Sequence, residues 1–170
     1  MDAEMADNFR RNLFKWRLLE NLTYEALAGM TEIDQRRLSY FEHGKREPTP
    51  EQYVAISRAL EVPLRDMVKP CGFDPDLTKE QRRQIVCWFE EERKAQNLTK
   101  IDWATKLFLD ANYYSDIVNQ FKVPSSKQLN LMAYNADTTV TAILAEIKNR
   151  PIGSAKPIGM GESGLDSSSL

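Results

Sequence analysis

The segment 22–48 constrains the fold of this chain more than any other part of its sequence. Thr23 and Asp34 each stand just before a short run whose apolar residues have helical spacing. Both residue types accept hydrogen bonds from the first free N–H groups of a helix. Leu27 supplies an inward apolar position, and Ala28 is small enough for a following helix to cross closely over it. The segment therefore predicts two short helices joined by a tight turn.

The second of these helices has a distinct inner and outer face. Leu38 and Phe41 lie three positions apart and form its buried stripe. Gly44 follows at the place where a left-handed C-terminal cap is expected, and two basic residues come directly after it. The side chains that lie off the buried stripe are those of Gln35, Arg36, Ser39 and Tyr40.

These positions together resemble the repressor-like (XRE or lambda-repressor-type) helix-turn-helix family, over roughly 9–67. A fourth helix that begins at Pro48 and the closing stretch 62–67 are also typical of that family. Glu32 departs from the pattern, because the family usually has glycine in the turn and a left-handed Glu is mildly strained. The resemblance implies that the helix 34–43 enters the major groove of double-stranded DNA.

The resemblance and the helical geometry assign roles to single residues. Gln pairs naturally with adenine in the major groove and Arg with guanine. The predicted base-contacting residues are therefore Gln35, Arg36, Ser39 and Tyr40. Phosphate contacts set the register of a protein on DNA, and they are predicted for Thr23, Tyr24, Arg37, Lys45 and Arg46.

The resemblance also implies a structural ion pair between the first and third helices. In the family this pair is partly buried, and here its members are Arg17 and Glu42. The alternative is that Glu42 is a simple exposed helix residue. Loss of one partner from a buried pair leaves the other charge stranded.

A shift of 76 residues, which brings Leu22 onto Leu98, aligns the first part of the chain with its second part. Cap, apolar and proline positions match without a gap, as expected of an internal repeat. We predict an all-α fold with two tandem lambda-repressor-like helix-turn-helix domains. The DNA-binding domain covers 6–69, and a degenerate helix-turn-helix-like helical domain covers 77–150.

The second copy differs from the first in its chemistry, because its presumed recognition helix has lost both arginines. Few cations mean little affinity from counterion release. Aromatic residues are enriched at protein interfaces, which favours assembly or partner binding over base reading, although Asn112 could read adenine. The candidate interface residues are Asn112, Tyr113, Tyr114 and Ile117, of which the last three would equally suit a core.

The last segment, 151–170, is rich in glycine, serine and proline and is expected to form a flexible, disordered tail. Turn-forming residues over 70–76 separate the two predicted domains.

The net charge is only −2, so nucleic-acid binding must rest on local charge. The basic residues close to the predicted DNA face are Arg10, Arg11, Lys15, Arg36, Arg37, Lys45 and Arg46.

Enzymatic readings find no support in the sequence. No catalytic constellation, metal site, cofactor site or small-molecule site stands out, and His43 fits a structural or phosphate-facing role. Self-cleavage at Cys71–Gly72 is rejected because helical repeats, rather than a β-rich protease domain, follow it. Cys71 and Cys87 fit reduced thiols of a cytoplasmic, nucleoid-associated protein, and no apolar run is long enough to cross a membrane.

The sequence thus predicts a sequence-specific DNA-binding transcriptional regulator, a repressor of phage or bacterial type. We expect a homodimer, with the second domain as the candidate dimer contact. The alternative is a helix-turn-helix-scaffold interaction protein of phage or mobile-element type whose main partner is another protein.

Overall fold

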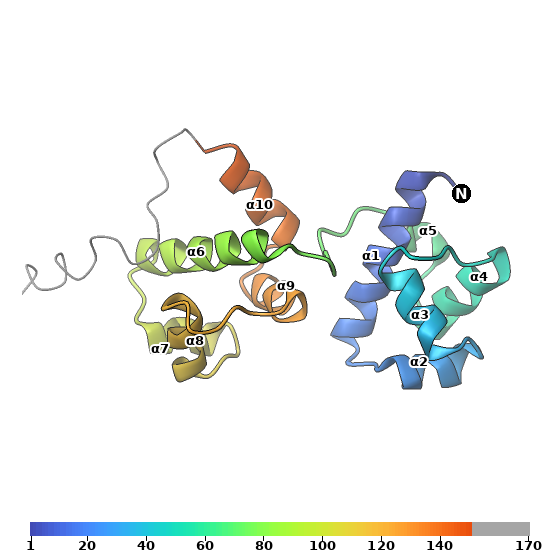
Figure 1. Cartoon of the computed structure of the whole chain (residues 1–170), viewed down its shortest axis with the longest axis horizontal. Helices are drawn as coiled ribbons and strands as arrows, with labels where there is room; N and C mark the ends of the chain where they lie inside the picture. The colour runs from blue at the N-terminus through green and yellow to red at the C-terminus, as the bar shows by residue number, and fades with distance from the viewer. Residues whose placement is uncertain (151–170) are drawn as a thin grey trace, which may run out of the picture. The chain divides into compact units, whose positions relative to one another are not determined.

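The structure, a computed structural model, describes residues 1–150, and the predicted tail 151–170 lies outside the described residues. The described part contains ten helices and no strand, which confirms the all-α prediction (Figure 1). The chain divides into two compact units, here called unit 1 (Met1–Asp76) and unit 2 (from Leu77 onward). None of the helices in the part of the chain that the structure describes is long and apolar enough to span a membrane.

Unit 1 is built from five helices around one apolar core. Their bounds are α1 Ala3–Leu19, α2 Tyr24–Thr31, α3 Gln35–Glu42, α4 Pro50–Ala59 and α5 Leu64–Met67. Helix α2 packs against α3 and α4, and α1 packs against α3 and α5. The fully buried side chains at the centre are those of Phe9, Leu13, Leu27, Leu38, Ile56 and Met67.

Side-chain caps fix the start of the two helices predicted from the segment 22–48. The Thr23 hydroxyl accepts from the Ala26 N–H at 3.0 Å. The Asp34 carboxylate accepts from the Arg36 N–H at 2.9 Å and from the Arg37 N–H at 3.3 Å. Each cap satisfies N–H groups that have no partner inside their helix, so these helix starts are encoded locally.

Two left-handed residues fix where α2 and α3 end. Glu32 has φ 58°, so the glutamate takes up the strained left-handed conformation predicted for the turn. Gly44 has φ 70°. Around it the Lys45 N–H donates to the Tyr40 carbonyl at 2.8 Å and the Gly44 N–H donates to the Phe41 carbonyl at 3.3 Å. This is the Schellman arrangement, and it orients the chain that leaves α3.

The residues that follow α5 fold back onto α1. Phe73 is buried, and Arg11 pairs with Asp74 at 3.3 Å. Arg10 pairs with Asp76 at 3.1 Å. Residues 73–76 are therefore part of unit 1 rather than a free connection between the predicted domains.

Unit 2 repeats the helix order of unit 1 at constant spacing. Its helices are α6 Lys79–Ala95, α7 Lys100–Lys106, α8 Ala111–Val118, α9 Ser126–Asn135 and α10 Val140–Lys148. Each of the five starts 76 residues after the corresponding helix of unit 1, as from Tyr24 to Lys100. The shift used to align the two parts of the sequence thus also aligns their helices.

The left-handed residues recur at the same spacing. Four residues of unit 1 with positive φ have a counterpart with positive φ exactly one repeat later in unit 2. The pairs are Asn21 and Asn97, Glu32 and Phe108, Gly44 and Gln120, and Glu61 and Asp137. Because left-handed conformations are uncommon for residues other than glycine, their recurrence reflects matching turns rather than matching helix lengths alone.

The two cores also correspond position by position, with compensating changes in size. Trp103 and Tyr114 are fully buried where unit 1 has the smaller Leu27 and Leu38. The smaller Ile117, which is 2% exposed, replaces Phe41. The prediction that Tyr114 and Ile117 belong to an interface is therefore wrong, because both side chains fill the core of unit 2.

Candidate nucleic-acid interface

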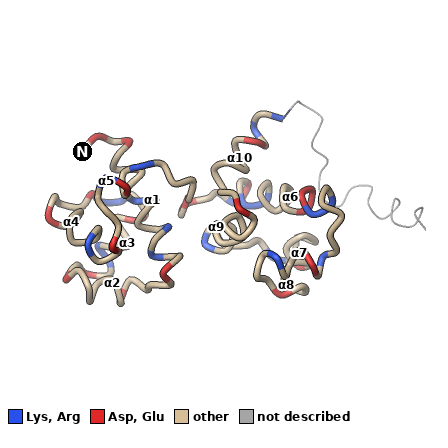
Figure 2. The backbone as a smooth tube through the Cα atoms, turned by 180° about the vertical axis from the view of Figure 1, so that it is seen from behind, with Lys and Arg blue, Asp and Glu red and all other residues tan. Residues whose placement is uncertain are grey.

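The outer face of α3 is polar and basic. Gln35, Arg36 and Arg37 are exposed, and Ser39 and Tyr40 are half-buried. In Figure 2 a basic stretch marks α3. The Asp34 cap holds the first turn, so Gln35, Arg36 and Arg37 leave the helix at its positively polarised N-terminal end.

Tyr40 lies between two cations on this face. The Arg36 Nε donates to the Tyr40 hydroxyl at 2.7 Å, and the Arg36 guanidinium carbon lies 5.5 Å from the ring centroid. The Lys45 Nζ lies 5.7 Å from the same centroid. The aromatic ring thus links the first turn of α3 to the chain that follows its C-terminus.

The predicted phosphate-contacting residues do not share one environment. Thr23, Arg37, Lys45 and Arg46 are exposed. Tyr24 is half-buried, and its hydroxyl donates to Glu42 Oε1 at 2.9 Å. Burial and the neighbouring carboxylate raise the pKa of Tyr24 to about 12, so the phenol keeps its proton. Since that one proton is already donated, the structure places Tyr24 in the ion-pair cluster described next rather than among free phosphate donors.

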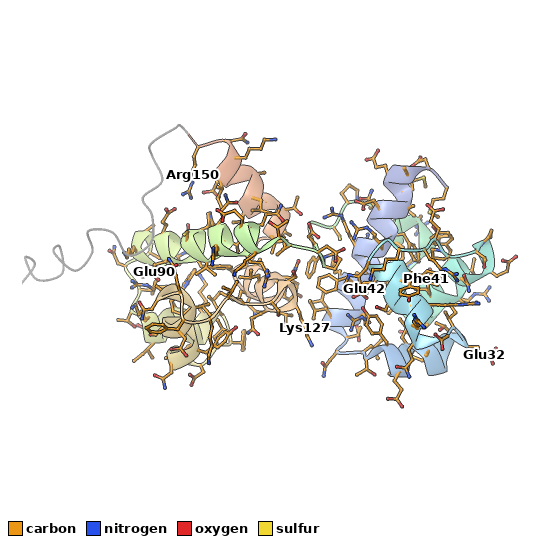
Figure 3. All side chains as sticks on the ribbon, in the orientation of Figure 1. Glu32, Phe41, Glu42, Glu90, Lys127 and Arg150 are labelled. Atoms are coloured by element: carbon orange, nitrogen blue, oxygen red, sulfur yellow. The ribbon has the colours of Figure 1, made fainter. Side chains whose placement is uncertain are left out.

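Arg17 on α1 forms a bidentate ion pair with Glu42, the last residue of α3, which Figure 3 labels. Arg17 Nε donates to Glu42 Oε2 at 2.8 Å, and Arg17 Nη2 donates to Oε1 at 2.7 Å. Glu42 is only 1% exposed, which excludes the alternative of a simple surface residue. Arg17 Nη1 also donates to the Leu22 carbonyl at 3.1 Å, so the pair fixes α1, the start of α2 and α3 together.

Two of the predicted local cations form ion pairs with carboxylates of unit 1. Arg10 and Arg11 both donate to Asp7, at 2.7 and 2.9 Å, in addition to their contacts with residues 73–76. Lys15 lies over the Trp16 ring at 4.8 Å. Within residues 1–150, five cations of the predicted cluster form no ion pair: Lys15 on α1, and the four around α3, which are Arg36, Arg37, Lys45 and Arg46.

Sequence reasoning missed one partner of this site. Asp76 Oδ1 lies 2.7 Å from His43 Nδ1, and His43 is the C-cap residue of α3. The two residues are 33 positions apart. No local pattern connects them, so only the fold reveals that the only histidine is a structural residue at the end of α3.

The equivalent face of unit 2 carries different side chains. Asn112 is exposed, and Lys122 Nζ lies 5.6 Å from the half-buried Tyr113 ring. Phe108 and Phe121 are 83% and 79% exposed, at the positions that Glu32 and Lys45 occupy in unit 1. The face has therefore exchanged charge for aromatic surface.

Residues 13–67 match the family model of the helix-turn-helix. Unit 1 is a helix-turn-helix domain. The predicted resemblance to the XRE type is thereby confirmed, and α2 and α3 are the two helices of the motif. The match ends within the helix-turn-helix domain and does not reach unit 2. No curated protein and no solved structure matches the chain.

The helix-turn-helix domain is a DNA-binding module, so the match supports DNA as the partner of unit 1. Among the described residues, no group of three or more His, Cys, Asp or Glu side chains is arranged to hold a metal ion. The exposed basic face of α3 is therefore the candidate interface of the helix-turn-helix domain.

Proposed function

We propose that this protein is a sequence-specific transcriptional regulator, a repressor of phage or bacterial type, in which α3 enters the major groove. The observation that carries the proposal is the group of four unpaired cations around α3 beside Gln35. Gln35 and Arg36 are the base readers, and Arg37, Lys45, Arg46 and Thr23 hold phosphates. Ser39 lies on the same face, one turn after Arg36.

Local rather than overall charge supplies the affinity. Unit 1 contains eleven Lys and Arg residues against fourteen Asp and Glu residues, so its net charge repels DNA weakly at long range. Glu42, Asp7, Asp74 and Asp76 are paired with internal cations. The cations at the recognition helix are left free to replace the counterions of the phosphates.

The double substitution Arg36→Ala with Lys45→Ala should weaken specific binding about tenfold to a thousandfold, because it removes one base contact and one phosphate contact. Binding is measured by gel shift on fragments of the protein's own promoter region, at two salt concentrations. The wild type should bind one fragment selectively and weaken steeply as salt rises.

Arg58→Ala with Arg65→Ala makes the matched control, because both residues are exposed on α4 and α5 and the net charge changes equally. The control should bind within about threefold of the wild type. Equal binding by the Arg36 and Lys45 variant would refute the DNA-binding mode and favour a protein partner as the main ligand.

We further propose that unit 2 is a degenerate copy of the helix-turn-helix domain and serves assembly as a homodimer. The constant spacing of helices and left-handed residues supports common descent. The exposed Phe108 and Phe121 support a protein contact, since such aromatic surface is stabilised when another protein covers it. Dimers would present two copies of α3 to half-sites about 34 Å apart.

Light scattering tests this assembly role. The full chain should have twice the mass of one 19.6 kDa chain, and a chain ending at Asp76 should be monomeric. The cut is placed there because residues 73–76 belong to unit 1. Phe108→Ser with Phe121→Ser should dissociate the full-length dimer. An unchanged mass in both variants would exclude unit 2 as the dimer contact.

A further inference from the structure

The Arg36 side chain is held by a neutral phenol instead of a carboxylate. Its Nε donates to the Tyr40 hydroxyl at 2.7 Å, one turn along α3. An exposed arginine is otherwise free to adopt many rotamers. Among the described residues, no other side-chain hydrogen bond or ion pair of Arg36 occurs, so the Nη1 and Nη2 groups retain their donors.

Tyr40 is itself fixed from its other side. Its carbonyl accepts from the Lys45 N–H at 2.8 Å and from the Arg46 N–H at 3.3 Å. The Lys45 ammonium lies 5.7 Å from its ring centroid. The half-buried ring therefore projects from backbone that is fixed by the cap of α3, and the Arg36 guanidinium lies beside it.

This support determines which edge of the guanidinium is presented. With Nε engaged, Arg36 can offer only the paired Nη1 and Nη2 donors to a ligand. Guanine is the base that shows two acceptors, O6 and N7, to the major groove, and a guanidinium can contact both at once. Adenine shows one acceptor beside a donor, so it cannot satisfy the same pair of donors.

We infer that Tyr40 is a positioning residue that holds Arg36 end-on toward one guanine and so determines specificity at that base pair. The inference rests on the proposed function. It also changes the role expected for Tyr40, from a residue that touches the bases to one that acts through Arg36. Removing its hydroxyl should affect discrimination at one base pair rather than affinity for every sequence.

The test begins with the preferred site of the wild-type protein, selected from randomised duplexes. Each guanine of that site is then replaced by adenine and by 7-deazaguanine, which lacks only the N7 acceptor. The guanine contacted by Arg36 is the one whose replacement lowers the affinity of the wild type for the duplex but does not change the affinity of Arg36→Ala.

At that base pair, Tyr40→Phe should lower the preference for guanine about three- to tenfold, the effect of one lost hydrogen bond. Its affinity for random duplexes should stay within about twofold of the wild type, because the charges are unchanged. The double variant Arg36→Ala with Tyr40→Phe should discriminate no less than Arg36→Ala alone. Tyr134→Phe, an exposed tyrosine of unit 2, is the control for loss of a phenol hydroxyl.

Two results that indicate a direct DNA contact of Tyr40 would overturn the inference while leaving the proposed function intact. One is an equal loss by Tyr40→Phe on all sequences, and the other is an additive loss in the double variant; either would mean that Tyr40 contacts DNA directly. Unchanged discrimination by Tyr40→Phe would also overturn it. If the wild type selects no duplex at all, the proposed function and the inference fail together.

Discussion

Replacement of Glu42 by alanine should lower the free energy of unfolding of unit 1 by about 3–5 kcal/mol, the range for breaking a buried ion pair. Glu42 is 1% exposed and accepts three side-chain hydrogen bonds, two from Arg17 and one from Tyr24. Without the carboxylate, the Arg17 guanidinium stays in a half-buried place with an uncompensated charge, and the Tyr24 hydroxyl loses its acceptor. Burying unpaired charge is among the few mechanisms that give such large effects.

Hydrogen exchange in increasing urea, followed peptide by peptide, measures this loss because it reports each unit separately. Peptides of α1 to α3 should lose protection in Glu42→Ala, while peptides of unit 2 should not change. Glu47→Ala is the matched control, since Glu47 is exposed a few residues later, and it should cost less than about 1 kcal/mol. A loss below that level in Glu42→Ala would mean that the pair contributes little to the fold.

Replacement of Glu90 by alanine should destabilise unit 2 by a similar amount, about 3–5 kcal/mol. In unit 2, Arg93 corresponds to Arg17, but Val118 stands where unit 1 has Glu42. The sequence therefore suggests that Arg93 has no carboxylate partner. In the structure Glu90 supplies one from α6 itself, three residues before Arg93 (Figure 3). Glu90 is 3% exposed and accepts from Arg93 Nε at 3.0 Å and from the Tyr114 hydroxyl at 2.8 Å.

The pH dependence of unit 2 gives an independent measure of the same cluster. Burial alone would raise the pKa of Glu90, but the hydrogen bonds from Arg93 and Tyr114 outweigh it and lower the pKa below its ordinary 4.5. The ionised Glu90 therefore stabilises unit 2 fully above about pH 4.5, and this contribution is lost as the pH falls through the lowered pKa.

This loss of stability at low pH should be visible in the wild type by hydrogen exchange of α6 and α8 peptides. The exchange is measured between pH 3 and 7 and corrected for the intrinsic exchange rate. Glu90→Gln should flatten this acid-side loss, because no proton is taken up at this position. Glu80→Ala, an exposed acid in the first turn of α6, should keep the wild-type profile. A Glu90→Gln variant with the full acid-side loss would assign the effect to another carboxyl group.

The sequence predicts this fold well where its signals are local. Thr23, Asp34 and Gly44 each act on N–H or carbonyl groups within a few residues, so their types reveal the helix boundaries directly. The same holds for Thr99 and Asp110, which cap α7 and α8. The matching helix order of the two units is visible in the sequence because these short-range signals recur with one spacing.

Contacts between helices, and changes of ion-pair partner, could not be predicted in the same way. Helical spacing shows that Tyr114 and Ile117 lie on an apolar face, but it does not tell whether that face meets the core or another molecule. Glu90 replaces a carboxylate that in unit 1 comes from a different helix, so alignment of equivalent positions cannot find it. The Tyr24 hydroxyl points to Glu42, which only the packed structure reveals.

The folded-back residues 73–76 leave almost no free chain between the two units. Asp76 is bound to His43 and Arg10 in unit 1, while the next residue, Leu77, is buried in the core of unit 2 and its N–H donates to the Ser126 hydroxyl at 3.2 Å. The Asp76 carboxylate therefore ties the last residue of unit 1 to His43, at the C-terminus of α3. The residue through which unit 2 is covalently attached is thus also a hydrogen-bond partner of the C-cap residue of α3.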